Sequence, residues 1–469
     1  MDSKPSGKYD MSQIKAINKV KYALPSNLNV IDRRTNKVNF ADQNDYSSTS
    51  GNELVVRLQA STDYVYGPNS YLVMDVQCTA VSGTDPIGFV NNTAMSLFDR
   101  VLYEDRSGAE LERNDSLNRY VAQVCPLHWS DEYTRTVVAA AGQFNTGTNV
   151  SDATTGIPTN NVYIKNGSEA NYDCRAGKLT VVIPLHWFLG VYKQETLVPS
   201  MLVSGSLVRL QLARPGDAFE AIGAGTSDVA SYQISNPRIV LDSLSLNPAI
   251  QKNLMEQSQA GGGLDFCYET AYYQSGNPGA LSNFNLQVNK AVSRCQRLYW
   301  SSRSQDTPSK AYESAGTAGS VDNLGATKLN ISQLDYRLGD LYFPQRVITV
   351  TNTDPNKNGA ELYENTLQSI HRMKTSVDPP SVSKDQFCNS GEPITGTAAN
   401  NRNNGKAVHC QSFEMSSALE YSGLAINNSR TLEARINFTS APPAAQIIDS
   451  WICYLKLAKC NQIRAVIKE

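Results

Sequence analysis

Two copies of the tetrapeptide PLHW are the first candidates for chemistry in this 469-residue sequence, because together they contain two of its four histidines and two of its four tryptophans. The copies span residues 126–129 and 184–187. Histidine can ligate a metal or transfer a proton in catalysis. The histidines, at positions 128, 186, 371 and 409, show no HxH, HExxH or paired cysteine–histidine spacing. We therefore predict that they pack against other side chains, with no metal ligand, no cofactor and no catalytic residue among them.

Other candidate groups are equally sparse. The adjacent acids Glu104–Asp105 and Asp131–Glu132 could supply the carboxylate pair of a glycosidase, but adjacency in the sequence does not measure the distance between carboxylates. We interpret them as exposed loop acids. Residues 354–359, DPNKNG, resemble part of a calcium loop but lack its spaced acids and final glutamate, which favours a turn. The sequence has no GxxxxGK or GxGxxG phosphate-binding motif and no GxSxG nucleophile elbow, so we predict that the protein is not an enzyme.

The balance of charges and the cysteines narrow the function further. The 42 lysines and arginines nearly match the 44 aspartates and glutamates, so we expect no sequence-specific binding to nucleic acid. Residues 1–20 contain no apolar segment of the kind found in secretory signals, so we expect assembly inside a cell and no secretion. Nine cysteines, an odd number without a CxxC pair, are expected to be reduced thiols.

From about residue 50, short runs rich in valine, leucine, isoleucine and tyrosine alternate with clusters of glycine, asparagine, proline, aspartate and serine. This pattern predicts strands joined by loops, and an all-β sandwich architecture. The clearest predicted strands cover residues 53–60, 71–78, 178–183, 207–213 and 238–246. Helical patterns are few, and they cover residues 10–24, 115–124, 187–192 and 361–373.

After a polar connector at residues 249–263, the sequence repeats its earlier pattern. Four pairs of segments match in collinear order: residues 53–77 with 264–288, TAMSLFDRVLYEDR (93–106) with KAVSRCQRLYWSSR (290–303), VRLQL (208–212) with ARINF (434–438), and VLDSL (240–244) with IIDSW (447–451). The second pair aligns Arg100 with Arg297. We predict that the chain is a divergent duplication.

The most distinctive stretch is LTVVIPLHWFLGVYKQETLVPSMLVSGSLVRLQLA, residues 179–213. It contains a strand pattern, a proline that stops the strand, a short aromatic-rich helix, a second proline, a small-residue turn and an alternating strand. Residues 409–438 contain a looser version without the prolines. This arrangement resembles the segment between two consecutive strands of a viral jelly roll. With their similar ends, DSLSL and DSWICY, the two halves resemble the double jelly-roll major capsid proteins of polinton-like viruses, virophages, large eukaryotic DNA viruses and the adenovirus hexon.

The resemblance implies an all-β fold of two consecutive eight-stranded jelly-roll β-sandwiches, with a few short helices and a short N-terminal helical arm. The implied parts are an arm facing the capsid interior at 1–46, a first jelly roll at 47–248, a connector at 249–263 and a second jelly roll at 264–469. Long loops that form the tower of the capsomer are implied at 143–177, 214–231, 304–335 and 375–409.

The resemblance also implies a structural role in the virion. Such a chain forms homotrimeric, pseudo-hexameric capsomers that tile an icosahedral shell. Its partners are then further copies of itself, neighbouring capsomers, penton proteins and minor or cement proteins, and the N-terminal arm contacts minor proteins or an internal membrane. We assign structural roles to Arg100, Tyr103, Arg297 and Trp300 in the D-like strands of the two halves, where D is the third strand of a jelly roll lettered B to I.

Two alternatives remain open. One is a secreted or surface β-sandwich that binds carbohydrate or acts as a glycosidase through exposed aromatic side chains and loop acids, and the other is a different shell or surface-layer protein. A secreted lectin-like protein normally carries a signal peptide, which favours the capsid interpretation. The excess of 23 tyrosines over 12 phenylalanines suits subunit interfaces and sandwich edges equally well.

Overall fold

The computed structural model describes residues 30–40, 45–47, 53–59, 63–82, 87–89, 93–142, 150–151, 158–159, 174–175, 177–221, 228–260, 263–304, 330–350, 359–373, 380–388, 407–414, 422–427, 430–439, 446–460 and 465–468. Three predictions lie outside these residues: the helix at 10–24, the turn at 354–358 and most of the tower loops. Among the described helices, none is long and apolar enough to cross a membrane.

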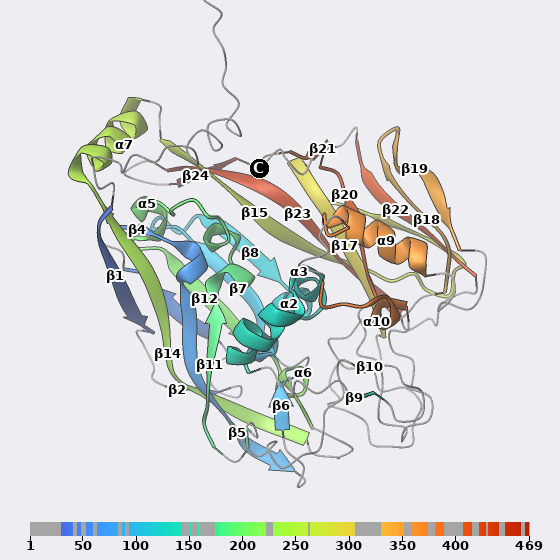
Figure 1. The fold of residues 1–469 in the computed structure, drawn as a ribbon, viewed down its shortest axis with the longest axis horizontal. Coiled ribbons are helices and arrows are strands. Elements are labelled where there is room, and N and C mark those ends of the chain that lie inside the picture. The colour runs from blue at the N-terminus through green and yellow to red at the C-terminus, as the bar shows by residue number, and fades with distance from the viewer. Residues whose placement is uncertain are drawn as a thin grey trace, which may run out of the picture.

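The first half of the chain forms two antiparallel sheets (Figure 1). One sheet has the order β1 (Val30–Asn39), β14 (Asp228–Leu246), β5 (Tyr71–Ser82) and β11 (Leu179–Pro184). The other has the order β3 (Glu53–Arg57), β12 (Leu207–Leu212), β7 (Phe98–Glu104) and β8 (Glu110–Asp115). Counted along the chain, these eight main strands occupy positions first, eighth, third and sixth in one sheet, and second, seventh, fourth and fifth in the other.

The second half repeats this order strand for strand. Its first sheet runs β15 (Leu264–Gly276), β23 (Gln446–Cys460), β17 (Val292–Ser304) and β20 (Val408–Ser412). Its second runs β16 (Asn283–Gln287), β22 (Leu432–Phe438), β18 (Ile331–Leu338) and β19 (Leu341–Thr349). The chain therefore contains two sandwiches of the same topology, as the predicted duplication requires.

Alternating side chains explain why these segments form half-buried strands. In β12, LVRLQL, every second residue is buried, and Val208, Leu210 and Leu212 face the first core. The equivalent β22 buries Leu432, Ala434 and Ile436 in the second core in the same way. A period of two places alternate side chains on one face of a strand, so the pattern that predicted these strands also fixes which face packs inward.

Two of the four matched pairs in the predicted duplication are wrong. The pairs 208–212 with 434–438 and 240–244 with 447–451 match equivalent strands, β12 with β22 and β14 with β23. The alignment of Arg100 with Arg297, in contrast, pairs the fourth strand of one sandwich (β7) with the third strand of the other (β17). The pair 53–77 with 264–288 is misplaced in the same way, because it matches β3 and β5, the second and third strands, with β15 and β16, the first and second. Both errors are a shift of one strand.

The shift has a physical cause in β1. This strand lies in the range assigned to an N-terminal arm, and it pairs with β14 from Val30 to Asn39. Most of its residues are exposed, so its sequence lacks the alternation that marks the other strands. Arg297 and Trp300 lie on a D-like strand as predicted, whereas Arg100 and Tyr103 lie on the next strand, E-like β7.

The remaining elements are short. The helices are α2 (Leu117–Gln123), α3 (Cys125–His128), α4 (Asp131–Tyr133), α5 (Ser200–Val203), α6 (Pro215–Ala218), α7 (Pro248–Ala260), α9 (Ala360–Ser369) and α10 (Lys384–Cys388). Single turns of 3-10 helix are η1 (Gly67–Asn69), η3 (Ala94–Leu97), η6 (Leu185–Trp187) and η7 (Gly190–Tyr192), and η4 (Thr134–Val138) is a π-helical turn. The minor strands are β2 (Asp45–Ser47), β4 (Tyr64–Val65), β6 (Ile87–Phe89), β9 (Val150–Ser151), β10 (Pro158–Thr159), β13 (Phe219–Ala221), β21 (Leu424–Ile426) and β24 (Ala465–Lys468).

The positions of these helices agree with the sequence predictions, but their lengths and types differ. α2 lies within the helix predicted at 115–124, α9 overlaps the helix predicted at 361–373 from one residue earlier, and the predicted helix at 187–192 is split between the two turns η6 and η7. The segment interpreted as a connector, 249–263, is mostly helix α7.

The two sandwiches share their cores at the joint between them, where α2 and α3 lie between the two sets of strands (Figure 1). Val124 and Leu127, from the first half, are buried in the core of the second sandwich. Phe266 and Tyr268, from the second half, are buried in the core of the first. This exchange of side chains makes the joint continuous with both cores.

Charged contacts also cross the joint. The carboxylate of Asp449, on β23, is completely buried and lies 2.7 Å from Arg303 Nε in its own sandwich. Arg119, on α2 of the first sandwich, approaches the same carboxylate at 3.9 Å. The hydroxyl of Tyr273 donates a third contact to it at 2.7 Å. A buried carboxylate needs such partners, and through Arg119 this cluster also links α2 to β23.

We expect Asp449→Asn to lower the free energy of unfolding by about 3 kcal/mol, because removing one partner of a buried ion cluster leaves its cations uncompensated. The matched control is Asp340→Asn. This aspartate is fully exposed and lies 3.9 Å from Arg337, so its loss should leave stability nearly unchanged. Urea unfolding followed by circular dichroism measures both. Equal, small effects of the two substitutions would contradict the importance of the buried cluster.

Candidate functional site

A cavity of about 520 Å³ lies at the joint between the two sandwiches. The first sandwich contributes β8, the segment from α2 to α4, and the segment after β11, and the second contributes β15, β17 and the residue Arg372 after α9. Its lining includes Glu112, Asn114, Tyr120, His128, Trp129, Tyr133, His186, Trp187, Lys193, Glu269, Ala271, Arg297 and Arg372.

The two PLHW copies meet on one wall of this cavity. The rings of Trp129 and Trp187 have centroids 4.8 Å apart. Tyr133 joins the copies, because its hydroxyl oxygen accepts a hydrogen bond from Trp187 Nε1 at 2.9 Å and lies 3.2 Å from His186 Nε2. The repeated motif is therefore a packing pair, and its two histidines do not face one another across a metal.

Local structure explains how each copy reaches the wall. The first forms α3 directly after α2, so the predicted end of the helix at 115–124 is followed by a second short helix before the chain turns. In the second, Pro184 ends β11 and the chain enters η6, as the proline predicted. The segment then passes so close to the second sandwich that a Cβ on Gly190 would lie 1.7 Å from the carbonyl oxygen of Glu269.

Both histidines of the motif are uncharged at neutral pH. Burial, with the nearby cations Lys193 and Arg297, lowers the pKa of His128 to about 3. Burial also lowers the pKa of His186 to about 4. His128 Nε2 lies 2.9 Å from the hydroxyl of Tyr299 in the second sandwich. Each of the two rings is therefore held by a tyrosine, Tyr299 for His128 and Tyr133 for His186.

The other two histidines lie elsewhere in the second sandwich. His409 stacks on Trp300 with centroids 4.2 Å apart, and His371 Nε2 lies 2.5 Å from Glu414. Within the described residues, no cluster of three or more histidine, cysteine, aspartate or glutamate side chains could hold a metal ion.

Glu112 is a buried carboxylate that connects three segments at the cavity. Its two oxygens accept the backbone N–H of Gly190 at 2.9 and 2.8 Å, and one also accepts the hydroxyl of Thr270 at 3.1 Å. Burial raises the pKa of Glu112, while the Gly190 N–H and the Thr270 hydroxyl oppose that rise. The carboxylate thereby ties β8 to η7 and to β15 of the second sandwich.

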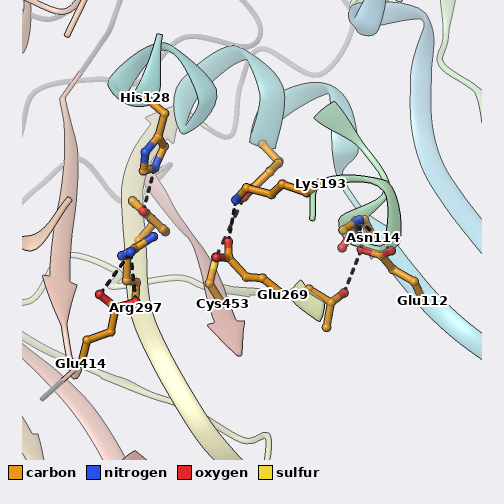
Figure 2. Close-up of polar contacts among 12 residues, drawn as sticks. Glu112, Asn114, His128, Lys193, Glu269, Arg297, Glu414 and Cys453 are labelled. Carbon is orange, nitrogen blue, oxygen red and sulfur yellow. Dashed lines mark hydrogen bonds and ion pairs between the residues drawn. The ribbon is translucent and has the colours of Figure 1, made fainter. Parts of the chain in front are cut away.

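Two ion pairs complete the polar wall (Figure 2). Lys193 Nζ lies 2.9 Å from Glu269, which joins the first sandwich to the second. Burial alone would raise the pKa of Glu269, but Lys193 and Arg297 outweigh it and hold that pKa at about 2. Arg297 donates to both oxygens of Glu414 at 3.0 and 3.1 Å. Figure 2 shows Lys193 and Glu269 between this pair and the Glu112–Asn114 group.

The remaining predicted residues have structural contacts. Arg100 Nε donates to Asp115 at 2.5 Å, the hydroxyl of Tyr103 donates to the Leu202 carbonyl at 2.8 Å, and Trp300 Nε1 donates to the Tyr336 hydroxyl at 2.9 Å. Of these sequence-predicted residues only Arg297 reaches the cavity.

One of the acidic pairs differs from its prediction. Asp105 is buried and not the exposed loop acid predicted, because its carboxylate accepts N–H bonds from Ser107 and Ala109 within a tight turn. Glu104 accepts from Arg209 at 3.3 Å, and Glu132 is exposed. Sequence reasoning missed Glu112, Lys193 and Glu269, which carry no motif and gain their roles only where the two sandwiches meet.

Comparison with solved structures gives matches over nearly the whole chain. A chain of the Sputnik virophage particle is 10% identical with a TM-score of 0.59, and the match covers 100% of this chain and 92% of that one. The fold is a double jelly roll. The Faustovirus major capsid protein is 8% identical with a TM-score of 0.55, covering 96% and 94% of the two chains. The mavirus major capsid protein is 12% identical with a TM-score of 0.51, covering 100% and 96%.

Sequence comparison alone finds no relative: no family model and no curated protein matches this chain. The predicted fold class, two consecutive jelly rolls, is nevertheless confirmed by the strand order and by these structural matches.

The partly buried histidines of the PLHW copies predict how the stability of the double jelly roll depends on pH. The unfolded chain protonates histidine near pH 6.5, whereas the folded pKa of His186 is about 4, so the unfolded state binds more protons between these values. Stability is therefore fully present above about pH 6.5 and is lost as the pH falls towards 4. Glu269, with a depressed pKa of about 2, acts in the same direction below about pH 4.5.

We expect His186→Gln to remove its share of this slope, which is up to about 1.4 kcal/mol per pH unit below pH 6.5. Urea unfolding between pH 7.5 and pH 4.5 measures the pH dependence of stability in both proteins. The raised pKa of Glu112 changes stability in the opposite direction, but equally in both proteins, so it cancels when the two slopes are compared. An unchanged slope in the variant would contradict the neutral state of His186.

Proposed function

We propose that this chain is a major capsid protein that forms homotrimeric, pseudo-hexameric capsomers of an icosahedral virus shell. The observation that supports this most directly is the pair of topologically identical jelly rolls in one chain, matched over its whole length by capsid-protein chains. Three copies of such a chain present six equivalent sandwiches, and closed rotational symmetry of three copies then gives an outline close to a hexagon. The role is structural and not enzymatic.

The rigid joint between the jelly rolls supports the same role. A tile in a closed shell must keep one shape, so its two halves need a fixed orientation. The shared cores and the buried Asp449 and Glu112 contacts supply this fixed orientation within the chain. Near-balanced charge, 42 basic against 44 acidic residues, limits repulsion between closely packed copies.

Exposed apolar side chains on two edge strands support contacts between copies. On β1, Val30 and Ile31 are exposed, and on β19, Leu341, Tyr342 and Val347 are exposed. Both strands lie at the end of a sheet, where unpaired backbone groups and apolar side chains favour association. We assign these edges to contacts between subunits.

We propose the further organisation on the same basis. The parts are an arm at 1–46, a first jelly roll at 47–248, a connector at 249–263 and a second jelly roll at 264–469. Within the range of the arm, β1 pairs with β14 and is counted with the first jelly roll. The partners are neighbouring capsomers, penton proteins and minor or cement proteins, and the arm contacts minor proteins or an internal membrane. The location is the capsid of the virion.

Purified protein should form stable trimers of three times 51.3 kDa, because the edge strands otherwise remain exposed. Mass measurement in solution and negative-stain imaging test this, and we expect pseudo-hexagonal outlines. A stable monomer that binds glycans would overturn the proposed function and favour a carbohydrate-binding sandwich.

Deleting residues 1–24 should leave these trimers intact, because the joint and the edge strands all lie outside that segment. It should impair shell formation, because the arm is assigned to contacts outside the capsomer. Size-exclusion chromatography reports the trimer and electron microscopy reports shells. Loss of the trimer itself in the deletion would show that the arm acts within the capsomer and not between capsomers.

A further inference from the structure

We propose that β19 of one copy packs against β1 of the next copy, so that the contact between chains repeats the contact that β8 makes with β15 within the chain. This inference rests on the proposed function and names the surfaces that join the copies. Within the chain, the fifth main strand of the first jelly roll, β8, meets the first main strand of the second, β15. The remaining fifth and first strands are β19 and β1.

The contact within the chain covers β15 with β8. The hydroxyl of Tyr268 on β15 donates to the carbonyl of Leu111 on β8 at 2.6 Å. The hydroxyl of Thr270, also on β15, donates to Glu112 on β8 at 3.1 Å. The next residue, Ala271, lines the cavity at the joint and is only 7% exposed. The first strand of one jelly roll is therefore buried by the fifth strand of the other.

β1 occupies in the first jelly roll the place that β15 occupies in the second. Asp242 on β14 and Asp449 on β23 are the equivalent aspartates of two matched segments. Arg33 on β1 lies 2.6 Å from Asp242, and Tyr273 on β15 donates to Asp449 at 2.7 Å. Arg33 and Tyr273 each pair with the residue two positions after the aspartate, so they are equivalent as well.

This equivalence makes the exposed Val30 the counterpart of the buried Ala271. Val30 pairs with Leu246 and Ala271 pairs with Cys453, and both of these partners lie four residues after the equivalent aspartate. Val30 is 38% exposed, and Ile31, which lies in a β-bulge beside it, is 61% exposed. β1 thus presents apolar side chains to solvent at the position where β15 is covered by β8.

β19 occupies the place of β8 in the same way. Glu112 on β8 lies opposite Tyr103, and Phe343 on β19 lies opposite Tyr336. The two tyrosines pair with the first residues of the matched segments VRLQL and ARINF, so Phe343 is the counterpart of Glu112. Its neighbour Tyr342 is 44% exposed. β19 therefore offers apolar surface where β8 offers a carboxylate, and this surface suits Val30 and not a hydroxyl such as that of Thr270.

Symmetry favours a contact between unlike edges. Two like edges, such as β1 with β1, form a two-fold contact that is complete with two copies. A contact in which β19 meets β1 runs from a fifth strand to a first strand, which is also the direction of the contact within the chain. Repeated in one direction, such contacts form a ring when the rotation closes, and three chains then give six sandwiches in sequence.

The charges favour the same pairing. β1 has three basic residues and one acid, whereas β19, the turn before it and α9 together have one basic residue and three acids. Contact between unlike edges therefore brings opposite net charges together, and contact between like edges does not. The charged residues are Asp32, Arg33, Arg34 and Lys37 in the first set, and Asp340, Arg346, Glu361 and Glu364 in the second.

The test uses the full-length protein with one cysteine on each edge, Val30→Cys and Tyr342→Cys, and a short bis-maleimide that links thiols. Both positions lie within one residue of the counterparts of Thr270 and Glu112, which are in contact within the chain. We expect the double variant to give covalently linked trimers on denaturing gels and each single variant to give no linked copies. The unchanged chain, with its nine cysteines, is the control for linkage through native thiols.

The outcomes separate this inference from the proposed function. Linked dimers of a single variant, beyond the linkage seen in the unchanged chain, would show that like edges meet and would overturn the inference. Trimers that mass measurement detects but that stay unlinked in the double variant would also overturn it, while the proposed trimer would stand. A stable monomer would overturn both.

A second pair of variants tests the same contact without a linker. Tyr342→Asp puts a charge into the proposed apolar contact and should weaken the trimer at least about tenfold on dilution. Leu281→Asp is the matched control, since Leu281 is 59% exposed and lies between β15 and β16, outside both edges, so its trimer should be unchanged. Circular dichroism checks that every variant folds. An unweakened trimer of folded Tyr342→Asp would contradict the contact, and this pair decides if the cysteine variants do not fold.

Discussion

The arrangement of this molecule depends on the cost of burying charge at the joint between its jelly rolls. Asp449 is completely buried on β23, and its partners come from both halves, Arg303 from one and Arg119 from the other. Arg303 and Tyr273 pair with this carboxylate inside the second jelly roll, and the longer contact of 3.9 Å to Arg119 crosses the joint, so rotation of the jelly rolls against one another would break that contact. Apolar packing alone would permit sliding, because it has little directionality. The ion clusters therefore set the orientation, and the shared cores supply most of the burial that stabilises it.

The same constraint explains the cavity. Glu112 needs the N–H of Gly190 and the hydroxyl of Thr270, and Lys193 needs Glu269. Each of these contacts holds backbone at a set distance, as the close approach of Gly190 to the Glu269 carbonyl illustrates. With the two walls fixed by polar contacts, side chains cannot collapse to fill the space between them, and the aromatic rings of the two PLHW copies line what remains. A packed apolar joint would have closed such a space.

Most of the fold was predictable because the pattern of each strand appears within its own short stretch of sequence. Most of the joint was not, because its contacts connect residues that are far apart in the sequence. Strands such as β12 and β22 alternate buried and exposed residues, so their sequences indicate both strand and face. β1 does not alternate, since it is an exposed edge held by backbone pairing and by Arg33, whose guanidinium lies 2.6 Å from Asp242. Missing it shifted the alignment of the two halves by one strand. Glu112, Lys193 and Glu269 look like ordinary polar residues in sequence, because their partners are up to 158 positions away.

A ring of six sandwiches made from double jelly-roll chains contains two kinds of joint, one within a chain and one between chains. In a capsomer of the proposed kind, three joints lie within chains and three between them. The joint within the chain forms during folding and can bury ions, because its two sides are linked through α7 and always meet in the same register. Joints between chains form later and must find their register by diffusion, so exposed edges such as β1 and β19 suit them better than buried carboxylates do. This difference explains why the sequences of the two jelly rolls have diverged. Asp449, Glu112 and the cavity constrain only one face of each jelly roll, and the opposite faces are free to specialise in contacts between copies.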